Sequence, residues 1–190
     1  MDIQRSDIPH IKPILINYLK FATARSEKSR QLEEEVKDIE NTEKDIEVLT
    51  DEIAAEGKNP EEVEEVIFPG RGIATLEGFE NLKKLRHINI SFNNVAKLDA
   101  LEKCLELQSI DASYNKITYI EGLHVLNNLS KLLIHNNKIS KLNDIYTLKF
   151  NAGLKELSIR GNPLTFSKSH KGELLQLLSG LTVLDGQPIT

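Results

Sequence analysis

Apolar residues recur in a fixed frame between residues 85 and 164. Asn93, Asn115 and Asn137 lie 22 residues apart, and Asn162 follows after a longer step of 25. The same apolar positions surround each asparagine, as one copy shows: Leu107, Ile110, Ala112, Asn115, Ile117, Ile120 and Leu123. A degenerate copy precedes the set. The pattern therefore predicts about five repeats of one structural unit.

Each repeat contains two apolar residues separated by one polar residue, which predicts a short strand whose side chains alternate between two faces. The asparagine that follows can bond backbone groups at the turn, which a tight coil would otherwise bury unpaired. Each coil buries its apolar edge only against its neighbours. We therefore predict an α/β fold, a right-handed solenoid with a curved parallel sheet, held by a structural ladder of Asn93, Asn115, Asn137 and Asn162.

The first third of the chain lacks the repeat frame, and we expect residues 1–60 to be a helical, acidic segment. Within it, Leu32, Ile39, Ile46 and Ile53 are spaced by seven over a predicted helix at about 26–56. Three alternatives stay open: an N-terminal cap on the solenoid, a helix that pairs with a partner or with its own copy as a coiled coil, and a segment disordered in isolation.

The repeat frame and the chain's end resemble the short 22-residue class of leucine-rich repeats. Its type member is a regulatory subunit of protein phosphatase 1, and outer-arm dynein light chain 1 and the spliceosomal A-prime protein share the class. The stretch from Asn162-Pro163-Leu164 to Val183-Leu184-Asp185-Gly186 resembles the C-terminal cap of that class, although the family's Tyr-Arg pair is replaced by residues 166–170. We expect repeats over 61–165 and a cap over 166–190. The resemblance implies protein binding, phosphatase regulation or a cytoskeletal role.

Charge and composition narrow the classes of function. Residues 1–65 carry nine basic against 18 acidic side chains, whereas residues 66–190 carry 15 against 11. This balance argues against nucleic acid as a partner. The start of the chain lacks a signal-peptide pattern, and no stretch is apolar enough to span a membrane. The single cysteine, Cys104, fits a reducing compartment, so we expect an intracellular, cytoplasmic protein, with cytoskeletal and nuclear sites open.

No catalytic constellation or metal site emerges from the sequence. The five histidines lack metal-ligand spacing, and Cys104 falls at a core position of the frame. We therefore expect a protein that is not an enzyme and needs no cofactor. Its function should reside in a surface that binds protein partners, as a regulatory or scaffolding adaptor.

The strands of a curved solenoid line its concave face, which is the usual contact surface. Reading the frame outward gives three columns along this face, the third of which includes Ser91 and Ser113. Large aromatic and arginine side chains usually dominate an interface. The predicted partner-binding residues are His87, Asn89, Phe92, Asp111, Tyr114, Lys131, Leu133, His135 and Arg160.

Overall fold

The computed structural model describes residues 59–189, all of which belong to the second of the two units of the chain, Lys44–Thr190. The predicted N-terminal helix at 26–56, its capping role and its pairing lie outside the described residues. The boundaries drawn at residues 60 and 165 stay predictions.

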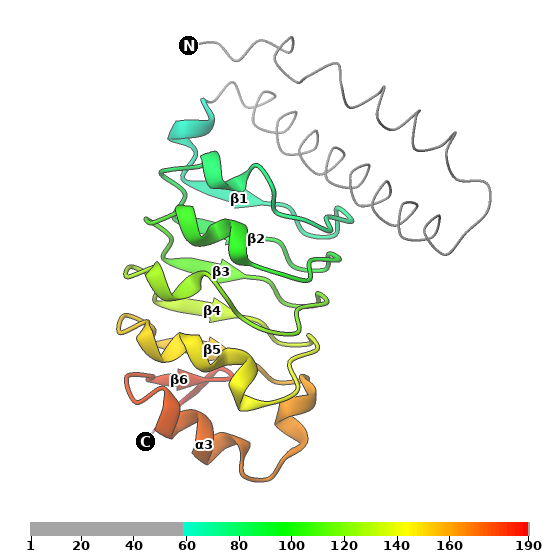
Figure 1. Cartoon of the computed structure of the whole chain (residues 1–190), viewed down its shortest axis with the longest axis vertical. Coiled ribbons are helices and arrows are strands. Elements are labelled where there is room, and N and C mark those ends of the chain that lie inside the picture. Colours follow the sequence, from blue (N-terminus) through cyan, green and yellow to red (C-terminus); the bar gives the residue numbers. More distant parts are fainter. Residues whose placement is uncertain (1–58, 190) are drawn as a thin grey trace, which may run out of the picture. The chain divides into compact units, whose positions relative to one another are not determined.

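One seven-stranded sheet runs through the described residues in the order of the sequence, and Figure 1 shows its strands stacked one coil after another. Neighbouring strands are parallel until the last pair, β6 and β7, which is antiparallel. The strands are β1 (Glu65–Ile67), β2 (His87–Asn89), β3 (Ser109–Asp111), β4 (Lys131–Leu133), β5 (Glu156–Ser158), β6 (Val183–Leu184) and β7 (Gln187–Pro188).

The middle residue of each repeat strand points into the core, as the alternation of apolar and polar positions predicts. The sheet register aligns these residues, and all are at most 3% exposed: Val66, Ile88, Ile110, Leu132 and Leu157. The rest of the core is aliphatic apart from Phe68, Phe79 and Cys104. Parallel pairing of in-register coils therefore produces one continuous apolar spine, and the predicted leucine-rich-repeat solenoid is confirmed.

The chain returns from one strand to the next through short 3-10 helices. These are η3 (Phe79–Asn81), η4 (Asp99–Lys103), η5 (Leu123–Val125), η6 (Leu142–Phe150) and η7 (Pro163–Phe166), while a sixth 3-10 helix, η2 (Pro60–Glu62), precedes β1. The nine-residue η6 is the longest of these six, and it lies in the coil with the 25-residue step. The extra residues of that coil thus lengthen a helix on the return side.

The four asparagines of the ladder are buried and bond to two coils each. The Asn115 side-chain Nδ2 donates to Ile90 O of the preceding coil and to Ala112 O of its own coil, at 2.9 and 3.2 Å. Its Oδ1 accepts from Val95 N at 2.9 Å. Asn93, Asn137 and Asn162 repeat this arrangement. Each amide therefore satisfies backbone groups that the tight turns would otherwise leave unpaired in the core.

An aspartate closes the ladder at the C-terminal end. Helix α3 (His170–Leu177) precedes the β6–β7 hairpin, whose two-residue turn is Asp185-Gly186 with φ values of 52° and 76°. Both values suit the Asp-Gly turn of a tight hairpin. The Asp185 Oδ1 accepts from Ile159 N and Arg160 N at 2.7 and 2.9 Å, so the last repeat also receives a side-chain acceptor.

Candidate functional site

The face of the sheet opposite the core, here called the open face, is formed by the outer residues of the repeat strands. The register aligns two columns along it. The first is Glu65, His87, Ser109, Lys131 and Glu156, and the second is Ile67, Asn89, Asp111, Leu133 and Ser158. These are the columns that the repeat frame predicts. Most of their members are exposed or half-buried, whereas Ser158 is buried.

Three ring side chains form a continuous row where the strands end. The rings of Phe92 and Tyr114 stack with centroids 4.3 Å apart and planes 9° from parallel. His135, on the next coil, meets Tyr114 edge to face at 5.4 Å. Phe92 is 59% exposed and Tyr114 45% exposed. We call Phe92, Tyr114 and His135 the aromatic row.

Phe92 and Tyr114 occupy a backbone position that favours glycine or asparagine. The residue before the ladder position is left-handed in every repeat, with Gly70, Asn136 and Gly161 at the other three coils. Phe92 has a φ of 59° and Tyr114 a φ of 54°. A bulky residue with positive φ costs roughly 1–2 kcal/mol. Two large aromatics therefore stand where the backbone disfavours them and where solvent reaches them.

Hydrogen bonds fix part of the open face. The Asp111 Oδ1 accepts from the backbone N and the Oγ of Ser113 at 3.0 and 2.6 Å, and Asn89 holds Ser91 in the same way. The third predicted column places Ser91 and Ser113 on the exposed surface, but both are buried because these hydrogen bonds hold them against the turn. Lys131 pairs with Glu156 at 3.2 Å. Asn89, Asp111 and Lys131 are thus partly engaged by their own neighbours.

The charges of Asp111, Arg160 and Asp185 act on the imidazole of His135. Burial lowers the pKa of its imidazole, with Arg160 adding to the decrease and the carboxylates of Asp111 and Asp185 opposing it. Its Nδ1 is buried and has no hydrogen-bond partner among the described residues. The imidazole is therefore held in its neutral form more strongly than an exposed histidine.

The structure brings together the predicted residues Phe92, Tyr114 and His135, with Asp111 and Arg160 close enough to affect the imidazole charge. His87, Asn89, Lys131 and Leu133 follow along the strands. The sequence reading missed Asp185 as a neighbour of the row. Its signal was the Asp-Gly pair, which predicts a tight hairpin turn that returns the cap to the last repeat.

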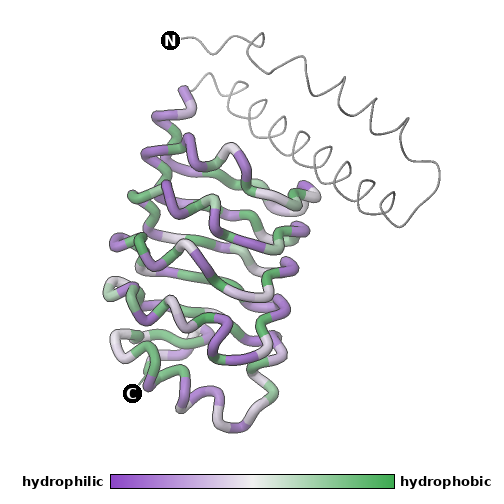
Figure 2. Tube along the Cα trace, in the orientation of Figure 1, coloured by the Kyte–Doolittle hydropathy of each residue, from purple (hydrophilic) through white to green (hydrophobic). Residues whose placement is uncertain are grey.

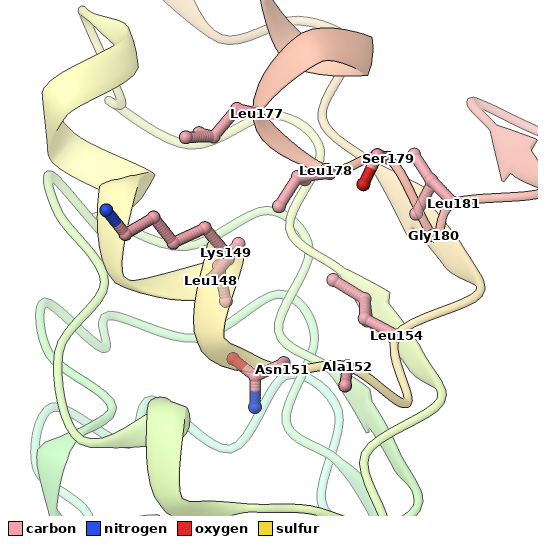
Figure 3. A pocket seen from close by; sticks show the side chains of 10 residues that line it. All are labelled: Leu148, Lys149, Asn151, Ala152, Leu154, Leu177, Leu178, Ser179, Gly180 and Leu181. Carbon is pink, nitrogen blue, oxygen red and sulfur yellow. The ribbon is translucent and has the colours of Figure 1, made fainter.

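Residues 59–189 contain no cluster of three His, Cys, Asp or Glu side chains that could hold a metal ion. Across the same residues, no helix has the length and apolar character needed to cross a bilayer. A cavity of about 250 Å³ lies between the end of η6 and the loop after α3, and half of its lining residues are leucines, among them Leu148, Leu154 and Leu178. Figure 3 shows these lining side chains. Its lining includes no Asp, Glu, His or Cys, so it assembles no acid–base pair.

A family described as Leucine-rich repeat matches residues 46–190, and the chain belongs to it. This class of repeat supports a protein–protein interaction module. The match covers the repeats and the cap, so the support for this fold and for a protein-binding module extends over most of the chain.

Two solved structures illustrate the similarity. The crystal structure of the Drosophila melanogaster SNF/U2A′ complex is 26% identical with a TM-score of 0.62, covering 66% of this chain and 74% of that one. The functional domain of InlJ from Listeria monocytogenes is 26% identical with a TM-score of 0.53, covering 69% of this chain but only 27% of that one. No curated protein matches the chain at a significant level.

Proposed function

We propose that this chain is a non-catalytic adaptor that binds a protein partner on its open face, anchored by the aromatic row. The residues proposed to contact the partner are those predicted from the sequence. Phe92, Tyr114 and His135 form the centre, and the surrounding residues are His87, Asn89, Asp111, Lys131, Leu133 and Arg160.

One observation carries the proposal: two exposed aromatics occupy strained left-handed positions next to each other. A glycine or asparagine would relieve the strain, as Gly70, Asn136 and Gly161 do at the equivalent positions. The exposed rings contribute little to the core, since their neighbours in sequence, the ladder asparagines, hold the turn. Large, stacked and rigid aromatics are typical anchors of protein interfaces.

The comparison with known structures supports protein binding as the class of function. U2A′ occurs in the SNF/U2A′ complex, bound to another protein, and this chain matches that structure over two thirds of its length. By analogy, the repeats of this chain supply a scaffold that presents side chains to a partner.

Affinity purification of the tagged full-length protein followed by mass spectrometry tests the proposal. We expect the wild type to capture a protein that Phe92→Ala/Tyr114→Ala loses by at least tenfold. The matched control is Tyr146→Ala/Phe150→Ala, which removes two exposed aromatics from η6 on the return side. Equal capture by both double variants and the wild type would contradict the aromatic row as the anchor.

The same experiment distinguishes finer roles that follow from the resemblance. A phosphatase catalytic subunit among the captured proteins would identify a regulatory subunit, and dynein or tubulin would identify a cytoskeletal component. We favour the adaptor because no residue of the described site is specific to either. We further propose that the protein acts inside the cell, as the single cysteine suggests. Residues 26–56 would pair with a partner helix or with a second copy of the chain.

A further inference from the structure

One edge of the solenoid is basic and contains no acidic residue. At the turns that follow the strands, five windows occupy equivalent places: residues 70–75, 92–97, 114–119, 136–141 and 161–166. We call these windows the turn edge. They carry five basic side chains and no Asp or Glu, whereas the remainder of 59–189 carries ten basic and 15 acidic side chains. The basic residues are Arg71, Lys97, Lys116, Lys138 and Lys141.

Backbone bonds bring the windows of successive coils into register. Asn94 N donates to Ile73 O, Lys116 N to Val95 O and Lys138 N to Ile117 O, at 2.7 to 2.9 Å. Lys116 and Lys138 therefore occupy the same place on adjacent coils, with strand spacing of about 4.8 Å. Figure 2 shows hydrophilic residues recurring at the turns of successive coils.

The four lysines of the turn edge are exposed, and no carboxylate of the described residues forms an ion pair with them. Among the described residues, the carboxylates of Glu64, Glu106 and Glu156 pair instead with Arg86 and Lys131, which lie outside the edge. Glu77, Asp99, Glu121 and Asp144 follow the first four windows in the sequence by two or three residues. Asp144 directs its Oδ2 to the backbone N and Oγ of Ser140 and to Lys141 N. No carboxylate of residues 59–189 therefore neutralises Lys97, Lys116, Lys138 or Lys141 through an ion pair.

Exposed aromatic rings accompany this charge. Phe92 and Tyr114 belong to the turn edge, and Phe166, at the end of η7, is 82% exposed on the last window. A surface with several lysines and three exposed aromatic rings complements a chain that carries carboxylates and apolar side chains together.

We propose that the turn edge binds an acidic polypeptide segment, whose carboxylates contact Lys97, Lys116, Lys138 and Lys141 while its apolar side chains contact the Phe92–Tyr114 stack. This inference rests on the proposed function, because it assigns the chemical class of the partner. It extends the contact surface from the open face onto the neighbouring edge.

The ring geometry favours a polypeptide over a single-stranded nucleic acid. Sequence-independent strand binding relies on bases that stack on free aromatic faces. Phe92 and Tyr114 stack on each other at 4.3 Å, which leaves no room for a base between them, and His135 already contacts Tyr114. The rings therefore offer a compact apolar patch to a side chain rather than a series of platforms for bases.

Fluorescence anisotropy with the full-length protein tests the proposal. The probe is a fluorescein-labelled peptide rich in Glu and Leu, long enough to span the five windows, roughly 20 Å. We expect Lys116→Glu/Lys138→Glu to weaken binding about tenfold, because two attractions become repulsions. The matched control is Lys84→Glu/Lys171→Glu, which reverses two exposed lysines outside the edge and should change binding by less than about twofold.

Each outcome decides the matter. Equal weakening by both double variants, or no binding of the acidic peptide to the wild type, would overturn the proposal. Tighter binding of a labelled oligothymidylate than of the peptide would overturn it in favour of nucleic acid. If Lys116→Glu/Lys138→Glu binds the peptide normally while Phe92→Ala/Tyr114→Ala still loses its captured protein, this inference fails and the proposed function stands.

Discussion

The ladder and the aromatic row are adjacent in sequence and opposite in character. Asn93 and Asn115 are at most 8% exposed and bond two coils each, whereas Phe92 and Tyr114, one residue earlier, are about half exposed. The ladder residues sit where the polar backbone of the turns demands an amide. The row residues sit where the backbone would accept a glycine at lower cost.

This difference separates stability from recognition within a single turn. A residue that the fold requires should cost stability when it is changed, and a residue that binding requires should cost affinity alone. Phe92 and Tyr114 each directly precede a ladder asparagine. Substitution of the aromatic residue should therefore lower affinity, and substitution of the neighbouring asparagine should lower stability.

The largest effect is expected for Asn115→Ala. It leaves Val95 N without its acceptor and removes the donor to Ile90 O and Ala112 O, all buried. At about 1–3 kcal/mol for each unsatisfied buried group, the free energy of unfolding should fall by about 3–5 kcal/mol. Urea denaturation followed by circular dichroism measures it.

The control is Asn94→Ala, an exposed asparagine one position after the ladder, whose side chain makes only a 3.5 Å bond to Gly72 O. It should change stability by less than about 0.5 kcal/mol. Similar losses for the two variants would mean that the buried amide does not hold the coils together.

A smaller loss of stability is expected at Gly161, which precedes the ladder residue Asn162 as Phe92 precedes Asn93. Gly161 has a φ of 72°, and a Cβ there would lie 2.2 Å from the Oδ1 of Asn136. Since that amide can move aside, backbone strain dominates, and Gly161→Ala should lower the free energy of unfolding by about 1–2 kcal/mol. Gly172→Ala, in α3 with open space around it, should instead raise it by about 0.5–1 kcal/mol.

The row itself should tolerate substitution in the folded state. Phe92→Asn relieves left-handed strain but loses the stacked pair, worth about 0.5–1.5 kcal/mol, so the free energy of unfolding should change by less than about 1 kcal/mol. Capture of the protein partner should nevertheless fall at least tenfold. A loss of stability comparable with that of Asn115→Ala would place Phe92 among the structural residues and remove it from the site.

The repeat period predicts the fold closely because it is imposed by a single geometric requirement. Each coil must bury Leu or Ile on one side and satisfy its turn with an amide, so the frame from Leu85 to Leu164 determines strand positions and register. The same reasoning predicts the two columns of the open face. Residue types that the backbone requires leave a periodic signal, and those residues are the ones that the sequence reveals.

Other features have no such period. Ser91 and Ser113 fall in an outward column, yet the preceding Asn89 and Asp111 draw their hydroxyls into hydrogen bonds and bury them. The return segments are 3-10 helices of different lengths, which depend on packing between coils. Stacking of Phe92 on Tyr114 depends on left-handed φ values that the residue types themselves do not favour.

The smallest effect is expected at His135, which belongs partly to each region: its ring borders the row, while its Nδ1 is buried without a partner among the described residues. Burial lowers the pKa of the imidazole below its ordinary value of 6.5, so the unfolded chain binds a proton more readily than the folded one. The free energy of unfolding therefore has its full His135 contribution above pH 6.5, and this contribution is lost as the pH falls below 6.5 and through the lower pKa of the folded state. Urea midpoints at pH 7.5 and pH 5 should show a larger drop for the wild type than for His135→Gln, whose side chain does not titrate in this range. A His135 imidazole that titrates by NMR at or above 6.5 would show that its neighbours Asp111 and Asp185 outweigh burial, and the imidazole would then carry a positive charge to the partner alongside Arg160.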